Sequence, residues 1–193
     1  MFVDYLTLIM VNLIAGTALL AYFVFTGLKP NKGLVAGFGI VGLIALVVGL
    51  HLTFTWPLPG SYNIIYGEAT TLFGAVFLGA ALALAKEWDL YPVTLYAFFA
   101  GIYAVIAGWQ IIAQGLTKAP IPSGLGFILA GLGGVFSPIA LKFKENKLLR
   151  WIAIAVLLAT IVLWGVTWYG SLSSHIQSFS KWVPDSMLLR QGK

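Results

Sequence analysis

The feature that most constrains this chain is a series of six long apolar stretches separated by short polar connectors. A transmembrane helix needs about 20 consecutive apolar residues to cross about 30 Å of hydrocarbon, and each stretch reaches that length. Because backbone groups inside lipid must be satisfied internally, and because the stretches do not alternate as barrel strands do, we expect helices. The sequence therefore predicts an all-α, polytopic membrane helix bundle with six transmembrane helices. They are expected at residues 5–28, 33–56, 63–85, 90–115, 123–143 and 148–170.

The composition excludes several other classes of protein. Hydrophobic residues make up 60% of the chain and charged residues 9%, against about 25% charged residues in soluble domains. The formal net charge of +5 comes from scattered residues, without the basic stripe typical of nucleic-acid binding. The chain has no cysteine, which excludes disulfides, thiolate metal sites and a cysteine nucleophile. The expected partner is the lipid bilayer, and no nucleic acid is expected.

The basic residues predict an orientation in the cell membrane. Cytoplasmic loops of membrane proteins carry an excess of lysine and arginine. The connectors after the first, third and fifth stretches hold most of the basic residues, and the opposite side holds few. Both termini are therefore expected on the extracytoplasmic side. The basic residues on the expected inner side are Lys29, Lys32, Lys86, Lys142, Lys144, Lys147 and Arg150.

The segment after the sixth stretch has a different pattern. Its apolar residues recur at helical spacing among serine, histidine, glutamine and lysine, which predicts a short amphipathic helix on the outer membrane surface. A frayed tail is the alternative. The expected organisation is a bundle over residues 1–170 and an extracytoplasmic tail over residues 171–193. The apolar residues of the tail are Leu172, Ile176, Phe179 and Val183, and Pro184 is expected to stop the helix.

Residues 13–34 and 98–125 resemble each other. Each contains an Ala-Gly pair followed, in the same order, by Gly-Leu, Lys, Pro and Gly-Leu. A unit of three helices would be inverted in its second copy, which gives the 3+3 inverted repeat of many transporters. The alternative is chance similarity, because glycine and alanine are abundant throughout the chain.

Polar residues concentrate in the outer half of the predicted bundle. His51 and Glu68 lie at about equal distances on either side of the turn between the second and third helices. An antiparallel hairpin places them at one depth, on the order of 8–10 Å below the helix ends. Asn12, Thr71 and Gln110 are expected in the same layer.

An ionisable group at this depth is unfavourable unless it is paired or hydrated, so the layer is a candidate polar site. One interpretation is a structural clasp in which His51 neutralises Glu68. A second is a proton-linked or ligand-binding site at Glu68. Transition metals usually require more ligands than one histidine and one carboxylate, so no metal and no cofactor is expected. Haem held by His51 and His175 remains the one cofactor option.

The stretch NIIYGEATTLFG, residues 63–74, carries a resemblance to a known family. Its Asn-x-x-x-Gly-Glu…Leu-Phe-Gly pattern, together with the hydropathy of the whole chain, resembles the uncharacterised prokaryotic integral-membrane family catalogued as domain of unknown function 981. The matching positions are Asn63, Gly67, Glu68 and Gly74. The resemblance implies a multi-pass helical bundle from a prokaryote and brings no activity with it.

Motifs for catalysis are missing from the sequence. It has no nucleophile elbow, phosphate loop, HExxH motif or paired carboxylates, so a role other than an enzyme is favoured. We expect an accessory or structural subunit of a membrane assembly, or a homo-oligomer, with a polar site in the outer leaflet. The alternative is a small proton-linked transporter or channel-like protein that uses Glu68. A membrane enzyme or electron-transfer subunit is the third interpretation.

Overall fold

The computed structural model describes residues 4–183 and is all-helical over that range. Six helices are long and apolar enough to cross a membrane, which confirms the predicted bundle. The first turns of the third helix are a π-helix, η1. The elements are α1 (Tyr5–Phe25), α2 (Lys32–Thr55), η1 (Asn63–Glu68), α3 (Ala69–Lys86), α4 (Tyr91–Ala113), α5 (Pro120–Lys142) and α6 (Lys147–Phe179).

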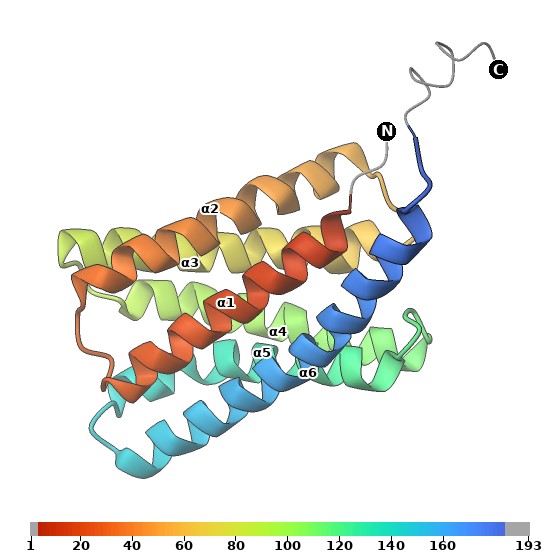
Figure 1. Cartoon of the computed structure of the whole chain (residues 1–193). Helices are drawn as coiled ribbons and strands as arrows, with labels where there is room; N and C mark the ends of the chain where they lie inside the picture. Colours follow the sequence, from red (N-terminus) through yellow and green to blue (C-terminus); the bar gives the residue numbers. More distant parts are fainter. Residues whose placement is uncertain (1–3, 184–193) are drawn as a thin grey trace.

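The helices form a ring in the order of the chain (Figure 1). Each helix packs against its neighbours in sequence, and α1 packs against α6, which closes the ring. The helices alternate in direction. The start of α1 and the end of α6 therefore lie at one end of the bundle, and the connectors after α1, α3 and α5 lie at the other end.

Glycines set the closest contacts of the ring. A Cβ atom added at Gly74 of α3 would lie 2.5 Å from the backbone nitrogen of Leu46 in α2. A Cβ atom added at Gly101 of α4 would lie 2.5 Å from the carbonyl oxygen of Gly131 in α5. Small residues let helix backbones approach closely, which is the main source of packing energy between helices in lipid. The α2–α3 and α4–α5 pairs are therefore two closely packed hairpins.

The close glycine contacts are distributed differently in the two halves of the predicted 3+3 repeat. If α4, α5 and α6 repeated α1, α2 and α3, the counterpart of the α2–α3 pair would be α5–α6. The pair that shares the backbone-to-backbone approach is instead α4–α5, through Gly101, Gly108 and Gly131. Between α5 and α6, the glycine Gly126 faces the indole side chain of Trp164 rather than backbone. The two halves of the ring are packed differently.

Aromatic side chains fill the interior of the ring. Tyr66 of η1 contacts Phe127 of α5 with ring centroids 6.0 Å apart, although these elements are not neighbours in the ring. Phe127 in turn contacts Trp164 of α6 at 6.0 Å. Trp164 clusters with buried residues of α1 and α2, including Leu13 and Leu52. These contacts cross the interior of the ring at this level.

The predicted boundary at the end of the sixth stretch is wrong. Helix α6 continues without a break through Gly170 to Phe179, and its 33 residues correspond to about 50 Å at about 1.5 Å per residue. Residues 171–179 therefore continue α6 instead of forming a separate helix. The rest of the predicted tail, from Pro184 onward, lies outside the described residues.

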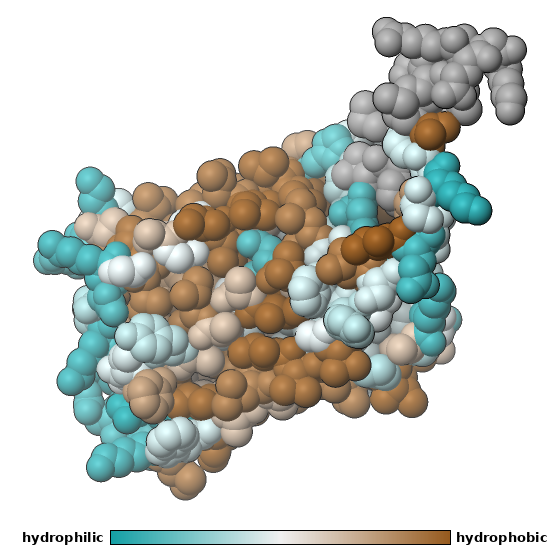
Figure 2. Space-filling view, in the orientation of Figure 1, coloured by the Kyte–Doolittle hydropathy of each residue, from teal (hydrophilic) through white to brown (hydrophobic). Residues whose placement is uncertain are grey.

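The surface matches a bilayer environment (Figure 2). Apolar side chains cover the flank of the bundle that is in view, and hydrophilic side chains gather at its ends. The connectors after α1, α3 and α5, which carry most of the basic residues, share one of these ends. The basic residues on the predicted inner side therefore meet at a single face of the structure.

Candidate functional site

The candidate site is built on η1, the π-helical turn that begins the third membrane helix. A π-helical turn accommodates an extra residue and occurs frequently at functional sites in proteins. The segment from Asn63 to Glu68 adopts this conformation, and the regular helix α3 follows at Ala69. The turn contains three of the four positions on which the family resemblance rests.

Asn63 holds the start of η1 in place. Its side chain is fully buried. The Oδ1 atom accepts a hydrogen bond from the backbone nitrogen of Leu58 at 2.9 Å. The Nδ2 atom donates to the carbonyl oxygens of Leu58 and Gly60. Asn63 thus supplies the loop between α2 and η1 with hydrogen-bond partners that the helices cannot provide.

Gly67 and Gly74 bring this segment against α2. A Cβ atom at Gly67 would lie 3.0 Å from the Cβ atom of Leu52 and 3.2 Å from the backbone nitrogen of Thr53. Gly74 makes the closer approach to Leu46 described above. Three positions of the family pattern therefore serve the packing of the α2–α3 hairpin. Glu68 does not, because its side chain points toward α4.

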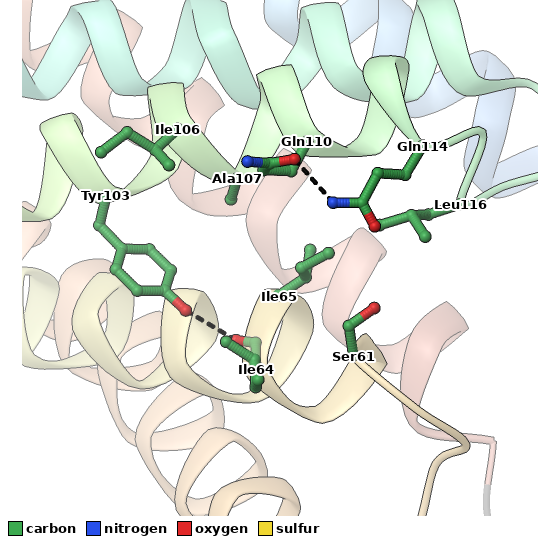
Figure 3. A pocket seen from close by; sticks show the side chains of 9 residues that line it. All are labelled: Ser61, Ile64, Ile65, Tyr103, Ile106, Ala107, Gln110, Gln114 and Leu116. Atoms are coloured by element: carbon green, nitrogen blue, oxygen red, sulfur yellow. Dashed lines mark hydrogen bonds between the residues drawn. The ribbon is translucent and has the colours of Figure 1, made fainter.

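Glu68 is hydrogen-bonded to a tyrosine on the neighbouring helix. The hydroxyl oxygen of Tyr103, in α4, lies 2.9 Å from Oε2 of Glu68. It also lies 2.9 Å from the carbonyl oxygen of Ile64 within the π-helical turn (Figure 3). Because a tyrosine hydroxyl carries a single hydrogen, it can donate to only one of these two oxygens at a time. Tyr103 therefore holds the carboxyl group beside a backbone acceptor and ties η1 to α4.

Tyr103 also lines a groove between η1 and α4. The groove has a volume of about 240 Å³, and its body is apolar (Figure 3). At its other end, Nε2 of Gln114 donates to Oε1 of Gln110 at 2.7 Å. Close by, the hydroxyl of Tyr62 donates to the carbonyl of Leu116. This bond joins the loop between α2 and η1 to the loop between α4 and α5. The lining residues are Ser61, Ile64, Ile65, Tyr103, Ile106, Ala107, Gln110, Gln114 and Leu116.

The predicted clasp between His51 and Glu68 is not formed. Nε2 of His51 lies 2.7 Å from the hydroxyl of Tyr5 in α1, and the two rings stack with centroids 5.5 Å apart. Within the described residues, the one ion pair with nitrogen and oxygen within 4.0 Å joins His175 and Asp4. His51 therefore faces α1, while Glu68 faces α4.

The other predicted site residues are also separated. Asn12 donates to the carbonyl oxygen of Val41 at 3.0 Å and links α1 to α2. Thr71 donates to the carbonyl oxygen of Gly67 within its own helix at 2.9 Å. Gln110 lines the same groove as Tyr103, at its other end. Of the five predicted residues, the structure brings Gln110 and Glu68 to the same groove region, through Tyr103.

The second histidine holds the two ends of the described chain together. Nδ1 of His175 lies 2.8 Å from Oδ2 of Asp4, which also caps α1 by accepting from the Thr7 backbone nitrogen. Burial raises the pKa of the Asp4 carboxyl, but the hydrogen bonds from His175 and Thr7 outweigh burial and lower it overall. His51 contacts Tyr5 of α1, and His175 contacts Asp4, the residue that caps α1. Haem ligation by these two histidines stays a prediction. Within residues 4–183, no three His, Asp or Glu side chains gather around a common point for a metal.

Tyr103 is the site residue that sequence reasoning missed. It lies among many aromatic residues of an apolar stretch, where a tyrosine is unremarkable. A usable signal was its position in the fourth helix, seven residues before Gln110 and therefore about two turns away on the same face. That spacing places Tyr103 on the same face of the fourth helix as Gln110, and deeper in the bundle.

These features define a membrane protein made of six apolar helices, with a partly buried carboxyl beside a lateral groove. The chain belongs to the family described as a protein of unknown function, DUF981, which matches residues 1–178. A search of curated proteins and a search of solved structures each gave no match.

The contact between Glu68 and Tyr103 predicts a thermodynamic coupling. In a double-mutant cycle, Glu68→Gln and Tyr103→Phe should change the free energy of unfolding non-additively, by about 0.5–3 kcal/mol, because the side chains touch. Glu68→Gln with His51→Gln should be additive within about 0.5 kcal/mol. Unfolding of the detergent-solubilised variants measures both cycles. Coupling in the His51 cycle and none in the Tyr103 cycle would contradict the observed pairing.

Proposed function

We propose that the protein is an accessory subunit of an assembly in the cell membrane, without a transport path of its own. The observation that supports this proposal is the set of contacts across the interior of the ring. Aromatic side chains of η1, α5 and α6 meet across the ring, and polar side chains within it bond to backbone of the same chain. Asn12 and Thr160 are examples, both buried and both bonded to carbonyl oxygens.

The outer face of α4 is the side that we propose for contact with a partner. Five large apolar residues follow each other there at spacings of four and three, the spacing of a helix–helix seam. Phe99 and Trp109 are 70% and 62% exposed, and aromatic residues contribute heavily to protein interfaces. The groove lined by η1 and α4 lies on the same side of the bundle. The seam consists of Leu95, Phe99, Ile102, Ile106 and Trp109.

Site-specific photocrosslinking in native membranes tests this role. A benzophenone amino acid in place of Phe99 or Trp109 should give the same discrete protein adduct from both positions. The same probe at Val47 of α2 or Val162 of α6, which are 60% and 63% exposed, should react with lipid alone. Adducts from all four positions, or from none, would contradict a contact at α4. An adduct that contains only this chain would identify a homo-oligomer instead of an accessory role.

Proton-linked transport is the second candidate, and one observation favours it. Glu68 is a partly buried carboxyl held by Tyr103 at the edge of a groove, and intramembrane carboxyls often carry protons in transporters. Purified protein in liposomes with a pH gradient distinguishes the candidates. Proton flux that Glu68→Gln abolishes would support transport, and flux equal to that of empty liposomes would support the accessory role.

We also propose that the end of the bundle formed by the start of α1 and the end of α6 faces the outside. Most basic residues lie at the opposite end, as the positive-inside rule requires of cytoplasmic loops. A cysteine at Glu145 should be shielded from an impermeant thiol reagent in intact cells, and a cysteine at Lys118 should react. Both positions are exposed, and the chain has no native cysteine to interfere. The reverse labelling pattern would invert the orientation.

A further inference from the structure

Glu68 lies in an apolar region of the bundle without a cationic partner among residues 4–183. Its carboxyl contacts the Tyr103 hydroxyl, and the one ion pair of the described residues is formed elsewhere, by His175 and Asp4. A carboxylate at membrane depth requires a proton, water or a cation to offset its desolvation. A cation is therefore one of the species that this position can accept.

The groove next to this carboxyl is suited to an apolar body. Its walls are mainly Ile64, Ile65, Ile106 and Ala107, and none of its lining residues is charged. Ile106 of the groove wall is 56% exposed, so a ligand can enter from the flank of α4 in a molecule without a bound partner. Its volume of about 240 Å³ is below the range of about 300–1,000 Å³ typical of drug-sized ligands. The occupant should therefore be small.

Tyr103 joins the two parts of the site. Its hydroxyl reaches the carboxyl, and the residue itself lines the groove. The face of a tyrosine ring attracts an organic cation. A single bound molecule can therefore place a cationic head against this ring, next to the carboxyl that lies just outside the groove lining, and an apolar body along η1 and α4.

We propose that Glu68, Tyr103 and the groove form a binding site for a small lipophilic ammonium compound. Glu68 supplies the countercharge, Tyr103 faces the head group, and the isoleucines contact the alkyl part. This site goes beyond the accessory role, because it needs no partner subunit. An anionic amphiphile is disfavoured by repulsion from Glu68, and a neutral one gains nothing from the carboxylate.

Three probes with the same alkyl chain and different charge test the proposal: hexyltrimethylammonium, 1-hexanol and hexyl sulfate. Equilibrium dialysis against the whole protein in phosphatidylcholine nanodiscs should show saturable binding of the ammonium compound only. Glu68→Gln should weaken that binding by at least about tenfold, because it removes the charged partner. Glu87→Gln, which removes an exposed acid outside the groove, should leave it unchanged.

A second pair of variants does not depend on the carboxyl. Ile106→Trp places a larger side chain at the groove wall and should weaken ammonium binding. Val47→Trp, on the exposed face of α2 and outside the lining, should not. These two variants decide the question if Glu68→Gln fails to fold.

Three results would overturn the proposal. Equal binding of all three probes would show an unselective apolar groove. Undiminished ammonium binding by folded Glu68→Gln would exclude the carboxyl. Absence of ammonium binding, together with an infrared carboxyl band that Glu68→Gln removes, would show that Glu68 carries a proton instead.

Discussion

Replacing Gly74 with alanine is expected to destabilise the protein by about 1–3 kcal/mol or more, the range for overpacking a closely packed core. The added methyl group would lie 2.5 Å from the backbone nitrogen of Leu46 and 2.9 Å from the carbonyl oxygen of Gly42. Backbone atoms cannot rotate away as side chains can, so α2 and α3 would have to separate. The midpoint and free energy of unfolding in detergent measure the loss.

Gly165→Ala is the matched control for this prediction. A Cβ atom at Gly165 in α6 would meet nothing within 4 Å. Alanine is also about 1 kcal/mol more favourable than glycine inside a helix. The control should therefore unfold at the same midpoint or slightly higher. If Gly74→Ala behaved like the control, the close approach of α2 and α3 would be wrong.

Replacing Asn63 with leucine is the second large effect that we expect. Leucine has a similar size but leaves the backbone nitrogen and carbonyl oxygen of Leu58 without their partner. Each buried polar group left unpaired costs about 1–3 kcal/mol. The loss should appear as a lower unfolding midpoint and as increased proteolysis between α2 and η1.

Asn31→Leu separates this effect from a general intolerance of leucine. Asn31 is exposed and caps α2 through a hydrogen bond from the Gly33 backbone nitrogen at 2.8 Å. Loss of a cap costs about 1 kcal/mol, so this variant should be clearly milder than Asn63→Leu. Equal losses in the two variants would argue against a special role for Asn63.

The sequence was sufficient to predict the six membrane helices, because length and hydropathy alone determine them. It was not sufficient to predict the end of α6. Gly170 followed by polar residues resembled a helix end, but a single glycine lowers helix stability by only about 1 kcal/mol. The hydrogen bond between His175 and Asp4 supports the continued helix. A contact between residues so far apart in the sequence cannot be predicted from the local residue pattern.

Glu68 was recognised from the sequence as a residue that needs a partner, but His51, its partner in one of the two interpretations, contacts Tyr5 instead. Equal distance from a turn predicts the depth of two residues and says nothing about the direction in which each side chain points. The π-helical turn adds to the error, because it rotates the following residues relative to a regular helix. The actual partner, Tyr103, is 35 residues away on α4, and only the packing of α4 beside η1 reveals it.

The closure of the ring by α1 and α6 has a consequence for biosynthesis. The hairpins α2–α3 and α4–α5 join neighbouring segments and can form as soon as each pair has emerged from the ribosome. Helix α1, made first, finds its final neighbour only when α6 is complete, and the bond between Asp4 and His175 spans 171 residues. Throughout translation, the flank of α1 that later contacts α6 must be covered by lipid or by the insertion machinery.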